Sequence, residues 1–141
     1  MTPRPRAKTR AATPADAKNY LQKSKEFLRA ASDSLELGNC TAATGNAVHA
    51  GISAGDAISA VLIGAVSQGE HADAVGHLEN IGGDAKSAAR QLRQLLPLKA
   101  QAEYDPSPLT VAVARRAVTA AERIVAIADR VVPKTAGPTG G

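Results

Sequence analysis

The sequence CTAATGNAVHAGISAGDAISAVLIGAV, from Cys40 to Val66, decides the fold of this chain. Almost every residue in it is Ala, Val, Ile, Leu or Gly, and this composition predicts one long helix that is apolar around most of its circumference. Such a helix is stable in water when other helices surround it. We therefore expect an all-α protein in which residues 40–66 form the central helix.

A thin line of polar residues interrupts the apolar surface of this predicted helix. Its four members follow one another at i, i+3, i+7 and i+10, which places them within an arc of roughly 80°; they are Asn46, His49, Ser53 and Asp56. Three interpretations are open: a solvated or interfacial edge of the helix, hydrogen bonds buried within a bundle, or a ligand-binding site.

A histidine and a carboxylate on one line also suggest acid–base catalysis, because the pKa of histidine lies near neutrality and a carboxylate can assist it. His49 and Asp56 are seven residues apart, about 10.5 Å along a helix. Two short side chains do not close that distance, so the spacing argues against a catalytic dyad. No strand–turn elbow presents Ser53 as a nucleophile either.

The first helix is predicted from its capping residues. Thr13 is an N-cap residue followed by Pro14 at the first helical position, and Gly38-Asn39 is a typical helix end. So short a link to the central helix makes the two helices antiparallel neighbours. Leucines at every seventh position form its core stripe: Leu21, Leu28 and Leu35.

Three more helices are predicted after the central one. A short helix covers residues 70–80, and a longer one follows a cap at Asp84 and continues to Ala102, with Pro97 expected to kink or restart it. Ser107-Pro108 predicts the start of the last helix, which runs to about residue 132. Two apolar stripes give this last helix a face wide enough to bury against a second subunit.

The glycines of the central segment predict close packing. Each glycine inside a helix costs about 1 kcal/mol relative to alanine. Four of them in one segment suggest that neighbouring backbones approach closely there; they are Gly45, Gly51, Gly55 and Gly64.

The predicted architecture is an up-and-down helical bundle of four main helices plus one short helix, with no strand. Residues 14–132 form the bundle, residues 1–13 a disordered basic arm, and residues 133–141 a flexible tail. The lone Cys40 fits a reducing compartment, and no stretch approaches about 20 uninterrupted apolar residues. We expect a cytoplasmic protein without a membrane span.

The positive charge of the chain is concentrated in the predicted arm. The net charge is +4, but the bundle is close to neutral, because four basic residues lie among the first ten; they are Arg4, Arg6, Lys8 and Arg10. Such an arm can neutralise the phosphates of a nucleic acid, or it can serve only as a solubilising tail.

Three segments give the chain a resemblance to the HEPN family, small all-helical domains of prokaryotic toxin–antitoxin, defence and nucleotide-handling systems. They are SDSLELGN at the end of the first helix, AVHAGISAGDAISA in the second, and LLPLKAQAEYDP before the last. The resemblance covers roughly residues 18–131. HEPN ribonucleases carry an arginine followed by a histidine, with four to six residues between the two. No arginine stands at this distance before His49, His71 or His77.

The other polar residues indicate neither a metal nor a cofactor. His71 and His77 are six residues apart, whereas paired ligands on a helix prefer a spacing of three or four. Acidic residues stand beside the evenly spaced arginines of the last helix, which argues against a phosphate-binding track there; the arginines are Arg116, Arg123 and Arg130, and the acids are Glu122 and Asp129.

Three functions follow as hypotheses. The first is a non-catalytic HEPN-like module, a homodimer through its last or its second helix, whose partner the resemblance implies to be a nucleotidyltransferase or an antitoxin-like protein. The second is a divergent, metal-independent ribonuclease that uses His49 with Tyr104 and Lys99. The third is an accessory protein that binds RNA or DNA through the basic arm.

Overall fold

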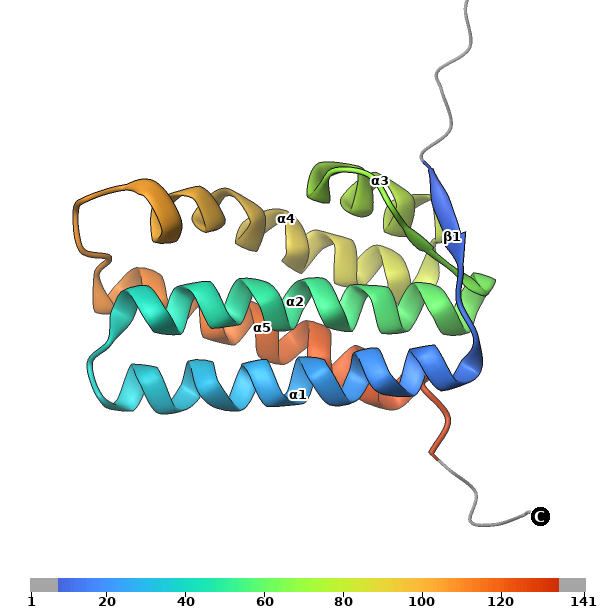
Figure 1. Ribbon diagram of the computed structural model, residues 1–141, viewed down its shortest axis with the longest axis horizontal. Coiled ribbons are helices and arrows are strands. Elements are labelled where there is room, and N and C mark those ends of the chain that lie inside the picture. Colours follow the sequence, from blue (N-terminus) through green and yellow to red (C-terminus); the bar gives the residue numbers. More distant parts are fainter. Residues whose placement is uncertain (1–7, 135–141) are drawn as a thin grey trace, which may run out of the picture.

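The computed structural model describes residues 8–134 of the chain. The described part contains α1 (Pro14–Glu36), α2 (Cys40–Ile63), α3 (His71–Ile81), α4 (Gly83–Tyr104), α5 (Val111–Val131) and two short strands, β1 (Thr9–Ala11) and β2 (Ala65–Ser67). Four long helices lie side by side, and short α3 packs on α4 at one end (Figure 1). The predicted all-α bundle of four main helices and one short helix is confirmed.

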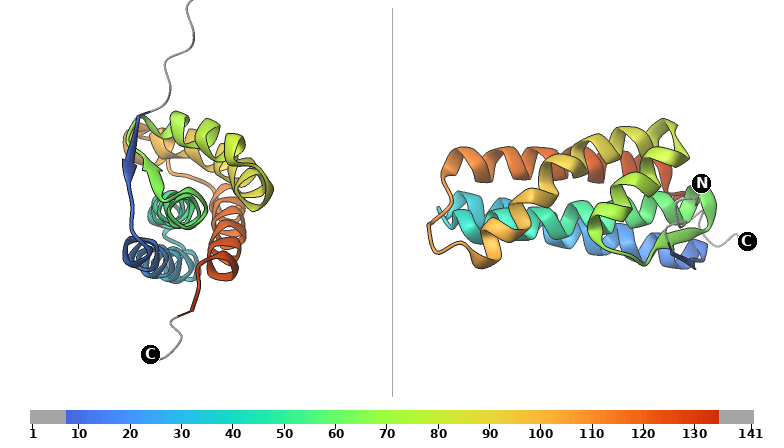
Figure 2. Two further views of the ribbon diagram at one scale, coloured as in Figure 1. Left: turned by 90° about the vertical axis from the view of Figure 1, so that its right-hand side faces the viewer. Right: turned by 90° about the horizontal axis from the view of Figure 1, so that it is seen from above.

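Helix α2 lies at the centre of the bundle. It packs against α1, α4 and α5, and α1 and α4 lie on either side of the α2–α5 pair (Figure 2). This arrangement leaves one edge of α2 uncovered by a long helix. Its exposed and half-buried positions between residues 43 and 60 all fall on that edge; they are Gly45, Asn46, His49, Ile52 and Asp56.

The first helix begins and ends as its capping residues predict. The Thr13 hydroxyl accepts the backbone N–H of Asp16 at 3.0 Å, and the Asp16 carboxylate accepts the N–H of Thr13 at 2.9 Å. This reciprocal capping box satisfies two backbone donors that the first turn would leave unpaired. At the other end, Gly38 has a φ of +78° and turns the chain toward α2.

The prediction that the chain contains no strand is wrong. Helix α2 ends at Ile63, because Gly64 adopts a left-handed conformation with a φ of +66°. The next three residues then pair antiparallel with β1, with Arg10 opposite Val66. Strands of three residues are too short to show a periodic pattern in the sequence.

The predicted disordered arm is correspondingly too long. Residues 9–11 form β1 and Thr13 caps α1, and of the predicted arm only residues 1–7, with Arg4 and Arg6, lie outside the described residues. The two-stranded ribbon is held on the bundle by Val66, which is 1% exposed and packs in a small cluster with Ala12, Ala17 and Ala60. Residues 135–141 of the predicted tail also lie outside the described part.

Within α2, the space beside the buried glycines is filled by side chains of other helices and not by their backbones. A Cβ atom at Gly51 would lie 2.6 Å from Leu95 Cδ1 and 3.2 Å from Ile124 Cδ1. At Gly45 it would meet no atom within 4 Å. The expected approach of backbones is therefore wrong within α2, where Gly51 leaves space for the side-chain ends of leucine and isoleucine from α4 and α5. It does occur at Gly64, just after α2, where the backbone of Ala12 donates a hydrogen bond to the Gly64 carbonyl at 2.9 Å.

Two helix starts differ from the prediction. Helix α4 begins at Gly83, so Asp84 lies in its first turn instead of capping it, and the helix continues through Pro97 without restarting. Helix α5 begins three residues later than the Ser107-Pro108 signature predicts, because the Thr110 hydroxyl caps it by accepting the N–H of Val113 at 3.2 Å.

Both apolar stripes of α5 are used inside the single chain. Residues of both stripes are almost completely buried. Ala121 and Ala128 belong to one stripe, and Ala117 and Ile124 belong to the other. Helix α5 contacts α1, α2 and α4 at once, and this explains its wide apolar face. The width of this face is therefore no argument for a second subunit.

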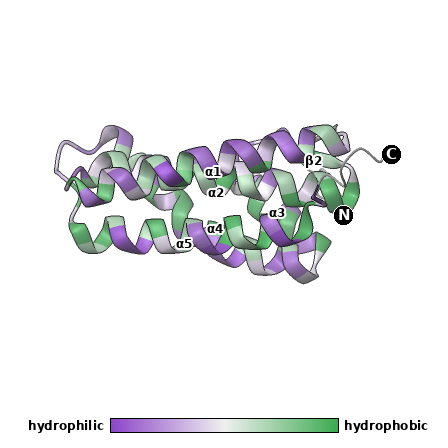
Figure 3. Cartoon of the chain, turned by 90° about the horizontal axis from the view of Figure 1, so that it is seen from below, coloured by the Kyte–Doolittle hydropathy of each residue, from purple (hydrophilic) through white to green (hydrophobic). Residues whose placement is uncertain are grey.

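By length and composition, α2 could also cross a membrane, but 61% of its most apolar 18-residue window is buried inside the bundle. The core helix of a water-soluble protein has the same properties. In Figure 3 the outer helices alternate between hydrophilic and hydrophobic segments, as helices do when one face packs on a core and the other faces water.

Candidate functional site

The polar edge of α2, defined as Asn46, His49, Ser53 and Asp56, runs from solvent to the underside of the ribbon. His49 is exposed, and its ring lies beside Phe27 of α1 with 5.2 Å between the ring centroids. The Asn46 side chain donates to the carbonyl of Ala42 at 3.0 Å. Ser53 is 9% exposed, and Asp56 is half-buried. The four residues share one edge but not one environment.

Asp56 lies at the closed end of this edge, where four polar residues surround a small cavity. These four form the ribbon cluster: Asp56, Ser59, Ser67 and His77. The cavity volume is about 10 Å³, which corresponds to a single water molecule at most. The cluster joins α2, β2 and α3, and it has no room for an organic substrate.

Burial raises the pKa of Asp56 to about 6, and the nearby positive charge of Arg10 opposes this shift only in part. No hydrogen bond, and no ion pair within 4 Å, joins the Asp56 carboxylate to another residue of the 8–134 range. Folding therefore takes an ionised carboxylate partly out of water without a direct partner, which is unfavourable at neutral pH. Perturbed carboxylates of this kind are typical of functional sites.

Ser59 and His77 form a direct pair within the ribbon cluster. Ser59 Oγ lies 2.7 Å from His77 Nε2, and the same hydroxyl donates its proton to the backbone carbonyl of Ala65. The hydrogen-bond network thus assigns the Nε2 proton to His77, which donates to Ser59. Burial lowers the pKa of His77 and keeps its ring neutral.

The geometry of the Ser59–His77 pair fits a structural hydrogen bond and not the activation of a serine nucleophile. A catalytic histidine must accept the proton of the serine hydroxyl, whereas here the Ser59 proton is directed at Ala65. Ser59 is also only 1% exposed. The pair fixes β2 and α3 on α2.

Arg10 belongs to the folded body and not to a free arm. It lies opposite Val66 in the ribbon, and such opposing residues project from the same face, here the one turned to the bundle. Its guanidinium donates to the Tyr20 hydroxyl at 2.6 Å. The neighbouring residue Lys8, also predicted to contact nucleic acid, is exposed at the start of the described chain.

The three catalytic candidates of the ribonuclease hypothesis are not brought together. Lys99 pairs with Glu103 one turn away, with 3.3 Å between Nζ and Oε1. Tyr104 is 78% exposed at the C-terminal end of α4, far from the ribbon (Figure 1). His49 contacts Phe27, and within residues 8–134 no hydrogen bond joins it to Lys99 or Tyr104.

Sequence reasoning found Asp56 but missed the rest of the ribbon cluster. Ser59 continues the polar spacing of α2 by three residues, so the same pattern extended by one step would have included it. His77 and Ser67 come from other elements, and only the fold brings them to Asp56. Within the described residues, no three His, Cys, Asp or Glu side chains gather as metal ligands do.

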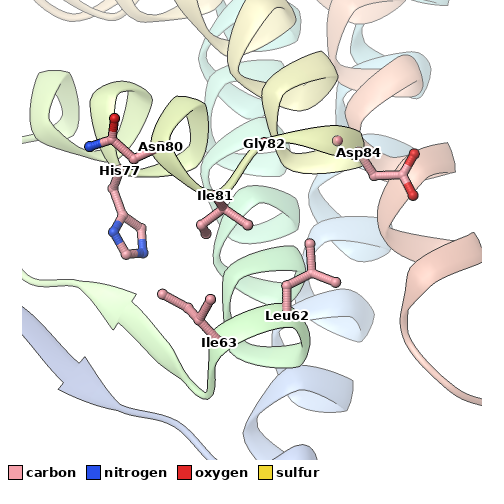
Figure 4. A pocket seen from close by; sticks show the side chains of 8 residues that line it. Leu62, Ile63, His77, Asn80, Ile81, Gly82 and Asp84 are labelled. Carbon is pink, nitrogen blue, oxygen red and sulfur yellow. The ribbon is translucent and has the colours of Figure 1, made fainter.

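A second feature lies next to the ribbon cluster, at the end of α2. Leu62 and Ile63 are 42% and 47% exposed, and together with Ile81 they form the apolar end patch. The patch lines an open cavity of about 650 Å³ whose rim includes His77 and Asp84 (Figure 4). Adjacent exposed apolar residues are typical of interaction surfaces.

Comparison with known proteins adds no family to this description. No protein-family model and no curated protein matches the sequence. The resemblance to the HEPN family depends on the three segments quoted above, and it stays a prediction.

Proposed function

We propose that this chain is a non-catalytic, HEPN-like binding module of the cytoplasm that forms a homodimer through the apolar end patch. The observation that carries the proposal is the exposure of Leu62 and Ile63 side by side at the rim of a cavity, although the rest of α2 is mostly buried. Burying such residues between two subunits contributes about 1.5–3 kcal/mol for each side chain that leaves water completely.

The charges around the patch allow two copies to meet. In a two-fold symmetric dimer the same patch faces itself, so any unpaired charge would meet its like. Asp84 at the rim is paired with Arg130 at 2.7 Å, and His77 is kept neutral by burial. The patch can therefore face a second copy without repulsion between unpaired charges.

The non-catalytic part of the proposal is supported by the polar residues. The Ser59–His77 pair is buried and wrongly polarised for nucleophilic attack, and His49 has neither an arginine nor a carboxylate in contact within the described residues. An acid–base site needs its groups within hydrogen-bond reach of a common substrate position. Neither His49 nor His77 meets that requirement.

The dimer is tested by sedimentation or light scattering at micromolar concentration. We expect a dimer for the full chain and a monomer for the double variant Leu62→Ser, Ile63→Ser. The matched control is Leu37→Ser, Val111→Ser, which removes exposed apolar residues from the opposite end of the bundle and should leave the dimer intact. A wild-type chain that is strictly monomeric contradicts the proposal.

The ribonuclease hypothesis is tested on mixed RNA without added metal. The proposal expects no cleavage above that of the His49→Ala variant. Metal-independent cleavage that this substitution abolishes would replace the proposal with the enzymatic function.

The resemblance also implies a heterologous partner, a nucleotidyltransferase or an antitoxin-like protein. Coexpression with such a protein encoded beside this chain, followed by copurification, tests the implication. We expect the Leu62→Ser, Ile63→Ser variant to copurify unchanged if the partner binds elsewhere, and to lose the partner if it shares the end patch.

A further inference from the structure

Three arginines of α5 converge on one open cavity at the surface between α4 and α5. The cavity has a volume of about 490 Å³ and is lined by Arg115, Arg116 and Arg123, with Gln94 and Thr119 beside them. We call these five residues the arginine strip. All three arginines are exposed. Two alanines, Ala112 and Ala120, complete the lining and leave room around the guanidinium groups.

Two carboxylates close to α5 are engaged in ion pairs with residues outside the strip. Asp129 pairs with Lys25 of α1 at 2.6 Å, and this pair lowers the pKa of Asp129. Asp84 pairs with Arg130 at 2.7 Å. Glu122 is exposed on the neighbouring face of α5, and no ion pair within 4 Å joins it to an arginine. Asp129 is therefore not available to the strip, whereas the charge of Glu122 remains beside it on α5.

The strip lies on the most positive side of the bundle. Helices α4 and α5 each carry four basic and two acidic residues, whereas α2 and α3 together carry three acidic and no basic ones. Arg90, one turn before Gln94 on α4, is exposed on the same side and has no ion pair in the described part of the chain. A concentration of one sign of charge attracts ligands of the other.

We propose that the arginine strip binds the phosphate groups of a nucleotide ligand, either a free nucleotide or the phosphodiester backbone of a nucleic acid. Arginine presents its donors in a planar fork that matches two phosphate oxygens at once. The Thr119 hydroxyl and the Gln94 amide supply neutral donors of the kind that accompany arginine in phosphate contacts. Seven residues separate Arg116 from Arg123, a rise of about 10.5 Å along the helix, so two phosphates can be held together.

The composition of the strip also predicts that binding does not depend on base sequence. The chain contains two tyrosines, one phenylalanine and no tryptophan, and none of them lines this cavity. Stacking of bases on aromatic rings is therefore absent from the strip. Contacts to phosphate alone position a nucleic acid without reading it.

The proposal is tested by fluorescence anisotropy with the full chain. The probes are a labelled single-stranded oligonucleotide of mixed sequence, a labelled nucleoside triphosphate, and a labelled polyglutamate peptide. The test variant is Arg116→Gln, Arg123→Gln. The matched control is Lys23→Gln, Arg29→Gln, which removes the same charge from exposed positions on α1. Circular dichroism melts check that both variants are folded.

We expect the test variant to bind the oligonucleotide or the nucleotide at least tenfold more weakly, and the control to change by less than about twofold. A plot of log K for the oligonucleotide against log salt concentration should become less steep by about 1.4, because the test variant loses two phosphate contacts with a single strand. The probe that binds distinguishes the two phosphate sources. Equal losses in both variants, no loss in the test variant, or equally tight binding of polyglutamate would each overturn the proposal.

Discussion

The two ends of the polar edge of α2 show how much one short ribbon changes the chemistry of similar residues. His49 and Asp56 lie on the same edge of the same helix, about 10.5 Å apart. His49 faces solvent beside Phe27, whereas Asp56 is covered by the ribbon and α3, and burial raises its pKa to about 6. The difference comes from what packs above the helix and not from the helix itself.

The ribbon is therefore part of the candidate site and not an appendage. It supplies Arg10 above Asp56, the Ala65 carbonyl that holds Ser59, and Ser67 in the wall of the small cavity. Perturbing the ribbon should affect the Asp56 end of the edge strongly and the His49 end weakly.

Deletion of residues 1–12 should have the largest effect. It removes β1 and exposes Val66, and it breaks the backbone hydrogen bond from Ala12 to Gly64. We expect a loss of about 3 kcal/mol in the free energy of unfolding, from one buried apolar side chain and several hydrogen bonds. Urea denaturation measures it. Deletion of residues 1–7, which keeps β1, is the control, and equal losses for the two deletions would contradict the role given to the ribbon.

The Asp56→Asn variant should be more stable than the wild type at neutral pH. The folded-state pKa of about 6 lies above the ordinary value of 3.8, so the folded form binds the proton more tightly and the wild type gains stability as the pH falls from about 7 to 4. Removing the charge should therefore stabilise the chain by about 2 kcal/mol at pH 8 and by little at pH 4. Denaturation midpoints over this range measure the difference.

In the Asp56→Asn variant, the titration of His77 makes stability depend on pH in the direction opposite to that caused by Asp56 in the wild type. Its pKa is lowered from 6.5 by burial, so the unfolded chain binds more protons below that pH and stability falls on acidification. With Asp56 replaced, we expect this loss of stability to become visible as the pH falls below about 6.5. An unchanged pH profile in the Asp56→Asn variant would show that the carboxyl group is hydrated and not covered by the ribbon.

Ser59→Ala should lower stability by about 1–2 kcal/mol. The substitution leaves the Ala65 carbonyl and the Nε2–H of His77 without their partner in a buried place, and unpaired buried groups cost about this much. Ser53→Ala is the control on the same edge, because no hydrogen bond of the Ser53 hydroxyl to another described residue is found. Thermal denaturation that gives the same midpoint for both variants would remove the structural role of the Ser59–His77 pair.

His49→Ala should have the smallest effect, about 0.5 kcal/mol. The exposed ring loses only its contact with Phe27, and pairs of rings contribute amounts of this order. The variant remains folded, so it is also suitable for the RNA cleavage test. A loss as large as that of Ser59→Ala would show that the open end of the edge is as tightly packed as the covered end.

Much of the helical framework could be predicted because helix ends and apolar stripes are local signals. Thr13, Pro14 and Gly38 mark α1 correctly, and the composition of residues 40–63 identifies the central helix. The start of α5 was misplaced because Ser107-Pro108 has the same local chemistry as a true cap, while the Thr110 hydroxyl provides the actual one. Only packing distinguishes two such signals three residues apart.

The candidate site was predicted only where it lies on one helix. The spacing of Asn46, His49, Ser53 and Asp56 placed them on one edge of α2, but it did not reveal that one end of this edge is covered. His77 and Arg10 are far from Asp56 in sequence, and a three-residue strand has no periodicity to predict it. Nor does the sequence reveal that Lys25 of α1 pairs with Asp129 across the bundle.

The sequence by itself determined which segments are helical, which helix lies at the centre, and which residues share its polar edge, because these properties depend on residues within a few turns of one another. The tertiary structure decided which end of that edge is buried, which serine meets a histidine, and which arginines stay unpaired. Those outcomes depend on contacts between elements distant in the chain, and burial, charge pairing and pKa are properties of such contacts.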